Sequence, residues 1–218
     1  MVRVFVLLYR YSMMNKPNNV FVLDDDPAVR DALSILVKSV NLNAIEFSSA
    51  NQFLDSYKQY DSGCLITDVY LPGMDGLALQ KHLNQIHSQL PIIVMSGHGD
   101  IPLAVKMIQR GALDFIEKPF ANHHMLERIQ QALKLDEERR HKENQWHHSQ
   151  QYYETLTPRE KEVLEFLIKG FSNKVIAAKM SVSPRTIETH RANILHKMHT
   201  DSVVSLAREV ALFRATVS

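Results

Sequence analysis

The chain has 218 residues, one cysteine and a formal net charge of +1. This length allows one large domain or two modest ones, since domains commonly hold about 150 residues. The single cysteine, Cys64, excludes an intramolecular disulfide framework and a cysteine-rich zinc module, and it favours a reducing compartment such as the cytoplasm. No apolar run approaches the roughly 18 residues of a membrane-spanning helix, so we expect no membrane partner.

The small net charge hides a division along the chain. Residues 19–125 hold seven Lys and Arg against twelve Asp and Glu, a net charge of −5, whereas residues 152–218 hold ten against seven, a net charge of +3. Such asymmetry is expected when the first part binds a cation, such as a metal ion, and the second binds nucleic acid. The charge pattern therefore predicts two parts with different partners.

Residues 1–18 form an N-terminal extension that fits neither half. Val2–Tyr9 is apolar and is followed by a polar segment, Asn15–Asn19. A secretory signal peptide would have a longer apolar centre and a small-residue cleavage site. We expect the natural start to be Met14, and an additional strand in this extension is the alternative.

From Val20 onwards, short apolar runs alternate with amphipathic segments. The runs are rich in β-branched residues and too short for helices, which predicts strands at Val20–Leu23, Ala44–Phe47, Cys64–Thr67, Ile92–Met95 and Ala112–Ile116. Helical periodicity is found in Ala28–Val40, Ala50–Tyr57, Leu77–Ile86, Leu103–Gln109 and Met125–Leu135. Because parallel strands need crossover helices, residues 19–135 are predicted to form a doubly wound α/β domain with a five-stranded parallel sheet.

The second half of the chain is predicted to be helical throughout. Residues 136–155 are interpreted as a helix that runs out into a solvated linker. A small all-α domain is then expected over residues 156–218, with helices at Pro158–Lys169, Asn173–Met180, Pro184–Met198 and Ser202–Phe213. Thr157, Ser172 and Ser183 are the predicted N-caps, and Thr157 forms a capping box with Glu160.

Polar side chains follow four of the predicted strands. Asp24 and Asp25 come after the first strand, Asp68 after the third, Ser96 after the fourth and Lys118 after the fifth. The carboxyl ends of parallel strands meet at one edge of a sheet, so these side chains are expected to converge. Carboxylates held close together repel each other unless a cation neutralises them, and an all-oxygen site suits Mg²⁺. The sequence therefore predicts a Mg²⁺ site at this edge.

Asp68 is the most suitable nucleophile of the three acids, since a carboxylate can attack phosphorus to give an acyl phosphate. Lys118 and the Ser96 hydroxyl would then hold the phosphoryl oxygens. Taken singly, each residue has an ordinary alternative: Asp24 and Asp25 could cap a helix, Asp68 could start a turn and Lys118 could lie on the surface. Their combination at the strand ends of one sheet favours the site.

Four segments of the first domain carry a family resemblance. FVLDDDPAVR, ITDVYLPGMDG, IVMSGHGD and GALDFIEKPF resemble the signature segments of response-regulator receiver domains, with GHGD and FIEKPF most similar to the FixJ branch. The resemblance covers residues 20–135 and implies a flavodoxin-like receiver fold. It implies that Asp68 accepts phosphate from a histidine kinase. It also implies that Mg²⁺ is bound by Asp24, Asp25, Asp68 and the backbone carbonyl of Tyr70.

The same resemblance implies two further features of the receiver domain. Lys118 is expected to precede a cis Pro119. Ser96 and Phe115 are expected to form a switch pair, in which the hydroxyl moves toward the phosphate while the aromatic ring turns inward. Ser at position 96 and Phe at position 115 are allowed variations of the family pattern.

The all-α domain contains a helix-turn-helix pattern. A short helix, a turn at residues 181–183 and a longer capped helix follow one another, and the longer helix of such a motif enters the major groove of DNA. Its predicted inward residues are Ile187, Ile194, Leu195 and Met198. Its predicted outward residues are Arg185, Glu188, Thr189, Ala192 and Asn193. The candidates for phosphate contacts are Lys174, Lys179, Arg191 and Lys197.

The segments LTPREKEVL, GFSNKVIAAKM and SVSPRTIETHRANILHKM resemble LuxR-type (NarL/FixJ) DNA-binding domains over residues 156–212. The resemblance implies that Glu188, Thr189 and Ala192 occupy base-contacting positions. For Glu188, accepting a hydrogen bond from a cytosine amino group is a sensible role. A helical bundle with a solvated basic face is the alternative.

Together, these features predict a phosphorylation-dependent transcription regulator of a two-component system, not an enzyme. Phosphorylation of Asp68 is expected to drive homodimerisation through the surface around Leu103–Lys118 and hence promoter binding. The expected partners are the cognate histidine kinase, promoter DNA and RNA polymerase. Two alternatives remain. One is a binding module switched by something other than phosphate, and the other is an enzyme that hydrolyses a phosphorylated substrate at Asp68. The D-x-D pattern of one class of phosphotransferase would require a second acid at position 70, where this chain has Tyr70.

Overall fold

The computed structural model describes residues 19–58, 62–97 and 101–215, so the predicted N-terminal extension lies outside the described residues. The chain divides into two compact units at the Arg139–Arg140 bond. The first unit is an α/β sheet domain and the second consists of helices. The predicted fold class, a doubly wound parallel sheet followed by a small all-α domain, is confirmed.

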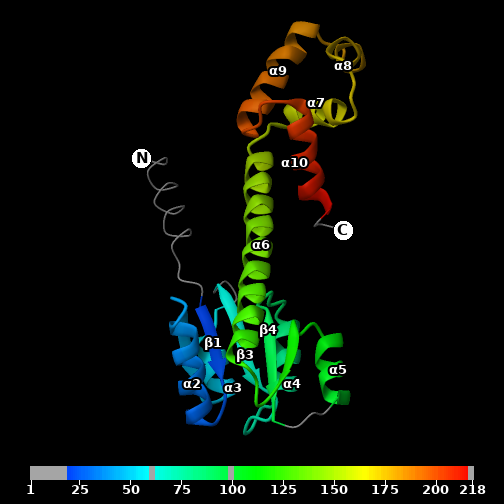
Figure 1. The fold of residues 1–218 in the computed structure, drawn as a ribbon. Helices are drawn as coiled ribbons and strands as arrows, with labels where there is room; N and C mark the ends of the chain where they lie inside the picture. Colours follow the sequence, from blue (N-terminus) through cyan, green and yellow to red (C-terminus); the bar gives the residue numbers. More distant parts are fainter. Residues whose placement is uncertain (1–18, 59–61, 98–100, 216–218) are drawn as a thin grey trace. The chain divides into compact units, whose positions relative to one another are not determined.

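The first unit is built on five parallel strands in the order β2-β1-β3-β4-β5 (Figure 1). The strands are β1 (Asn19–Leu23), β2 (Asn43–Phe47), β3 (Gly63–Asp68), β4 (Ile92–Ser96) and β5 (Asp114–Glu117). The helices that alternate with or follow them are α2 (Pro27–Lys38), α3 (Ala50–Ser56), α4 (Gly76–Gln85), α5 (Ile101–Gln109) and α6 (Asn122–Glu154). The strand order reverses between β1 and β3, which is where open sheets of this kind place their sites.

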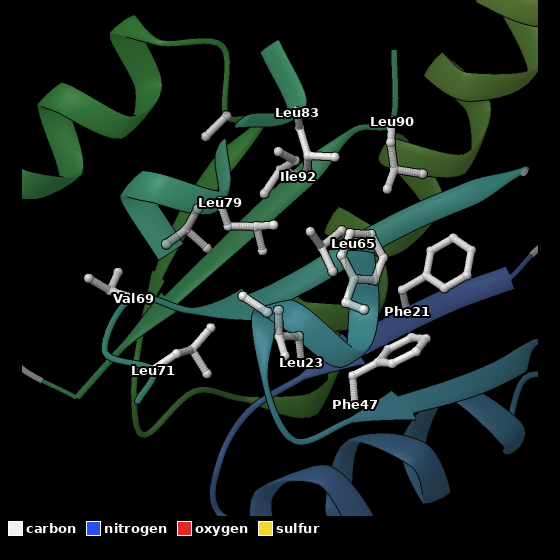
Figure 2. Close-up of a cluster of buried hydrophobic side chains, with 14 of the residues drawn as sticks. Phe21, Leu23, Phe47, Leu65, Val69, Leu71, Leu79, Leu83, Leu90 and Ile92 are labelled. Atoms are coloured by element: carbon white, nitrogen blue, oxygen red, sulfur yellow. The ribbon is translucent and has the colours of Figure 1, made fainter. Parts of the chain in front are cut away.

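Both faces of the sheet are buried, because successive side chains of a strand point to opposite faces. Phe21 and Leu23 of β1 join a cluster under α3, α4 and α5, whereas Val20 and Val22 join a second cluster under α2 and α6. Figure 2 shows the first cluster, in which the Phe21 and Phe47 rings lie with centroids 6.3 Å apart. Burial on both faces explains why the strands appear in the sequence as continuous apolar runs.

Helix α6 is much longer than the predicted Met125–Leu135 segment, since it continues to Glu154. Two charged residues beyond Leu135 bind the sheet domain: the Asp136 carboxylate accepts a hydrogen bond from the backbone N–H of Gly63 at 3.0 Å, and Arg139 donates to the backbone carbonyl of Gln89 at 3.0 Å. Within the part of the chain that the structure describes, α6 and the other helices lack the combination of length and apolar character needed to cross a membrane.

In the described part of the second unit, four further helices pack around one apolar cluster. They are α7 (Pro158–Ile168), α8 (Asn173–Met180), α9 (Pro184–Lys197) and α10 (Val203–Ala215). The predicted capping box of Thr157 and Glu160 is present, and Ser172 and Ser183 cap α8 and α9 as expected. Tyr152 and Tyr153, at the end of α6, pack against this cluster.

Gly63 is required by a close approach of two strands. Its φ is 140°, and a Cβ atom there would lie 1.9 Å from the backbone oxygen of Asn19. Replacing Gly63 with alanine is expected to lower the free energy of unfolding of the sheet domain by about 3 kcal/mol, measured by urea denaturation. Gly73, whose φ is 82° with open space around it, is the control, and its alanine variant is expected to lose only about 1 kcal/mol. Equal losses would contradict this explanation.

Candidate functional site

Strand register places the acidic residues side by side. Leu23 of β1 pairs with Thr67 of β3, so Asp24 and Asp68, which follow them, lie at the same edge. Asp25 comes from the same loop as Asp24. One carboxylate oxygen from each of the three aspartates lies within 4.8 Å of the others. The three carboxylates therefore converge at the point where the strand order reverses.

Lys118 neutralises part of this acidic cluster. Its Nζ atom lies 2.6 Å from Oδ2 of Asp24 and 2.9 Å from Oδ2 of Asp68. Burial lowers the pKa of Lys118, but hydrogen bonds to the two carboxylates outweigh this effect and leave the pKa above its ordinary value. The lysine therefore stays charged at neutral pH. The expected cis peptide bond between Lys118 and Pro119 is confirmed.

The cluster fits a divalent cation in both chemistry and charge. Three carboxylates supply only oxygen ligands, the type that Mg²⁺ prefers. Within the cluster, one ammonium group leaves two negative charges uncompensated, which matches a divalent ion. Backbone N–H groups of Asp26 and Tyr70 orient the carboxylates of Asp24 and Asp68, at 3.0 and 3.3 Å. The Tyr70 side chain itself is exposed.

Ser96 and Phe115 lie on the two neighbouring strands β4 and β5. Ser96 ends β4, is fully buried, and accepts a 2.8 Å hydrogen bond from the backbone N–H of Lys118 at its carbonyl oxygen. Phe115 pairs with Val94 and packs, half-buried, against the first apolar cluster. The Phe115 ring is therefore partly covered by the core.

The helix-turn-helix surface has the predicted two-sided character. Ile187 and Ile194 of α9 are buried, as is its C-cap Met198, and Leu195 is half-buried. The predicted outward residues Arg185, Glu188, Thr189, Ala192 and Asn193 are all exposed, and Glu188, Thr189 and Ala192 among them are the predicted base contacts. The Thr189 hydroxyl donates to the backbone carbonyl of Arg185 at 3.1 Å. Among the phosphate candidates, Lys174 and Lys179 are exposed and Arg191 is half-buried, and Lys179 also lies over the Phe171 ring.

Two family models match the chain: the response regulator receiver domain over residues 20–130 and the bacterial regulatory proteins of the luxR family over residues 154–210. The chain is 43% identical over 196 residues to the response regulator protein TodT of Pseudomonas putida, covering 90% of this chain and 86% of TodT. It is 40% identical over 195 residues to the transcriptional regulatory protein FixJ of Bradyrhizobium diazoefficiens, covering 89% of this chain and 95% of FixJ.

A solved structure titled "Low Resolution Structure of Response Regulator StyR" matches with a TM-score of 0.83 and 36% identity, over 90% of this chain and 99% of that one. The chain belongs to the response-regulator family. It is a two-component response regulator with a receiver domain and a LuxR-type DNA-binding domain, the domain composition of transcription regulators such as FixJ.

Arg30 is a residue of the receiver site that sequence reasoning missed. One guanidinium nitrogen, Nη1, donates to the backbone carbonyls of both Asp24 and Asp25, at 2.8 and 3.0 Å. Arg30 therefore fixes the backbone that carries two of the three acids. The sequence does contain a signal for this role of Arg30. It lies six residues after Asp24, on a helix whose N-cap is Asp26.

Replacing Arg30 with alanine is expected to weaken Mg²⁺ binding to this response regulator about tenfold, because supporting groups around metal ligands commonly contribute that much. Isothermal titration calorimetry measures the dissociation constant. Lys38, an exposed cation in the last turn of the same helix, gives the control variant K38A, which is expected to bind like wild type. Equal affinities of R30A and K38A would contradict the positioning role.

Lys197, a predicted phosphate contact, has an internal partner that the sequence analysis did not foresee. Its Nζ atom lies 2.7 Å from Oε2 of Glu160, which is buried and closes the capping box with Thr157. Burial raises the pKa of Glu160, but the hydrogen bonds from Lys197 and Thr157 outweigh burial and leave it below its ordinary value. This ion pair therefore ties the end of α9 to the start of α7.

The Glu160–Lys197 pair predicts a pH dependence of stability. Because the pKa of Glu160 is lower in the folded state, the pair contributes fully above the unfolded value, roughly 4.3, and its contribution is lost as pH falls through the folded pKa. The variant E160Q is expected to lower the unfolding free energy of the DNA-binding domain by about 2 kcal/mol at pH 7 and to remove this acid dependence.

Urea denaturation as a function of pH tests this prediction. The control is E162Q, which removes the exposed Arg159–Glu162 pair and is expected to cost less than about 0.5 kcal/mol. An E160Q variant that is as stable as E162Q at neutral pH would show that the buried pair does not hold the domain together.

Proposed function

We propose that phosphorylation of Asp68 by a cognate histidine kinase switches this response regulator between two states and thereby controls promoter binding. The observation that carries the proposal is the position of the Asp68 carboxylate, 2.9 Å from Lys118 Nζ and within 4.8 Å of oxygens from Asp24 and Asp25. Asp68 has 13% of its side chain exposed, compared with 1% for Asp24. Asp68 is thus the more accessible of these two acids to a phosphodonor.

The chemistry is a transfer between two protein side chains. A carboxylate oxygen of Asp68 attacks the phosphorus atom, the bond from phosphorus to the kinase histidine breaks, and an acyl phosphate forms. Mg²⁺ held by Asp24, Asp25, Asp68 and the Tyr70 carbonyl would neutralise charge on the phosphoryl oxygens. Lys118 reaches the same group with its ammonium, and Ser96 supplies a hydroxyl at the edge of the neighbouring strand.

The proposed response is homodimerisation through α5 and β5. Ile101, Val105 and Ile108 are spaced at four and three residues, so they form one apolar stripe on α5, and they are 73, 48 and 43% exposed. A stripe of this kind on an otherwise acidic domain supports an interface with a second copy. Movement of the Ser96 hydroxyl and the Phe115 ring would couple the phosphate to this face.

The variant D68N is expected to take up no phosphoryl group from acetyl phosphate with Mg²⁺ and to stay monomeric, since an amide is not a nucleophile toward phosphorus. Intact-mass spectrometry and analytical ultracentrifugation measure the two effects. The exposed Asp31 gives the control variant D31N, which is expected to behave like wild type. Phosphoryl uptake by D68N would contradict the proposal, and continuous turnover of acetyl phosphate by wild type would favour an enzyme instead.

The proposed target is double-stranded promoter DNA, bound by the exposed face of α9 in each of two copies. Arg185, Glu188, Thr189 and Ala192 would contact bases, and Lys174, Lys179 and Arg191 would contact phosphates. For Lys197, a phosphate contact would be a secondary role, because its ammonium group already binds Glu160. We also propose RNA polymerase as a partner and the cytoplasm as the location, where promoter DNA is found.

Two substitutions on the DNA-binding domain should have different effects. K174A is expected to weaken binding to all duplexes alike and to reduce the slope of log affinity against log salt by about 1, because one phosphate contact is lost. E188A is expected to relax discrimination at one base pair, by about 1–3 kcal/mol, with the salt slope unchanged. Fluorescence anisotropy with a selected site and its single-base variants, at several salt concentrations, measures both. Identical effects of the two substitutions would contradict the assignment.

A further inference from the structure

Helix α5, which would carry the proposed dimer interface, has few side chains buried against the rest of the domain. Of its nine residues, only Met107 is fully buried. Ile101, Val105 and Ile108 point their apolar side chains toward solvent. A helix with so few buried side chains gains little from packing, so specific hydrogen bonds have a large influence on where it lies.

Two side-chain amides of α4 hold the C-terminal end of α5. Gln80 donates from Nε2 to the backbone carbonyl of Met107 at 3.0 Å, and Asn84 donates from Nδ2 to the backbone carbonyl of Arg110 at 2.9 Å. Gln80 and Asn84 are four residues apart, so they lie on the same face of α4. The two hydrogen bonds therefore form a pair that fixes one end of α5 to α4.

The other end of α4 lies against the phosphorylation site. A Cβ atom at Gly76, the first residue of α4, would lie 2.6 Å from the backbone oxygen of Asp68, and the Gly76 N–H donates to the Val69 carbonyl at 2.8 Å. Leu79 and Leu83 are buried in the first apolar cluster and hold α4 on the sheet. A short, well-packed helix thus runs from the backbone of Asp68 to the end of α5.

The chemistry of Gln80 indicates a role other than stability. Its side chain is buried with the whole residue 1% exposed, and among the described residues its Oε1 atom has no hydrogen-bond partner. A buried polar atom without a partner is unfavourable, and leucine has a similar volume with no polar atom to satisfy. The Gln80 amide therefore carries a cost in stability at Oε1, while its N–H group holds the Met107 carbonyl.

We propose that Gln80 and Asn84 are positioning residues that couple the Asp68 site to α5. The helix α4 transmits a displacement of the Asp68 backbone to its two amides, which move the C-terminal end of α5 and thereby the apolar stripe. This inference rests on the proposed function, because it concerns how phosphorylation at Asp68 reaches the dimer face. It assigns the coupling to the α4–α5 contact, in addition to the Ser96–Phe115 pair on β4 and β5.

The test measures coupling and phosphorylation separately in the full chain. The dimer dissociation constant is determined by analytical ultracentrifugation with Mg²⁺ alone and with Mg²⁺ and acetyl phosphate, and the ratio of the two constants is the coupling. The variants are Q80L and N84D, the latter replacing the amide donor by an acceptor of the same shape at an exposed position. The control is K81A, an exposed residue between them on the same helix. Intact mass reports phosphoryl uptake, and urea denaturation reports stability.

We expect wild type and K81A to have the same coupling ratio, and Q80L and N84D to have a ratio about tenfold smaller. Phosphoryl uptake by both variants is expected to remain at the wild-type rate, with the stability of Q80L equal to or above that of wild type. A merely structural role would instead lower stability and leave the ratio unchanged.

Full phosphorylation of both variants with a wild-type ratio would overturn the inference while leaving the proposed function intact. A wild-type protein that takes up phosphate without any change in dimerisation would overturn both.

Discussion

The contact between Lys118 and the carboxylates of Asp24 and Asp68 is the interaction on which the receiver domain depends. Three acidic side chains within 4.8 Å of one another repel strongly, and the ammonium group of Lys118 offsets part of this repulsion. The site is therefore held together by charges that remain only partly balanced. The same imbalance favours the binding of a divalent cation there.

The position of this site supports the proposed coupling to the apolar stripe on α5. It lies at the reversal of strand order, where β1, β3, β4 and β5 all end at one edge, so a change at Asp68 reaches several elements at once. One proposed route runs through Ser96 and Phe115 on β4 and β5, and the other through Gly76 into α4. Both proposed routes lead toward α5, in which only Met107 is fully buried. A helix with so few buried side chains is suited to the proposed two-state switch.

Much of this molecule could be predicted from the sequence, because strand ends and helix caps are local features. The convergence of Asp24, Asp68 and Lys118 follows from apolar runs that end in polar residues, and the capping box at Thr157 follows from spacing alone. Contacts between distant residues could not be predicted in this way. Glu160 and Lys197 are 37 residues apart, and their pairing depends on how α7 and α9 cross. The predicted linker likewise begins with charged residues, which the sequence indicates are exposed to solvent. In the structure, however, the first of them, Asp136, accepts a hydrogen bond from the backbone N–H of Gly63.

The central claim is that Asp24, Asp25 and Asp68 form one divalent-cation site beside Lys118. Crystals of the full chain grown with Mn²⁺, which binds the same oxygen ligands as Mg²⁺ and scatters anomalously, test this claim most directly. The account predicts an anomalous peak bounded by the three carboxylates. An empty site at saturating Mn²⁺, or carboxylates that point away from one another, would contradict it.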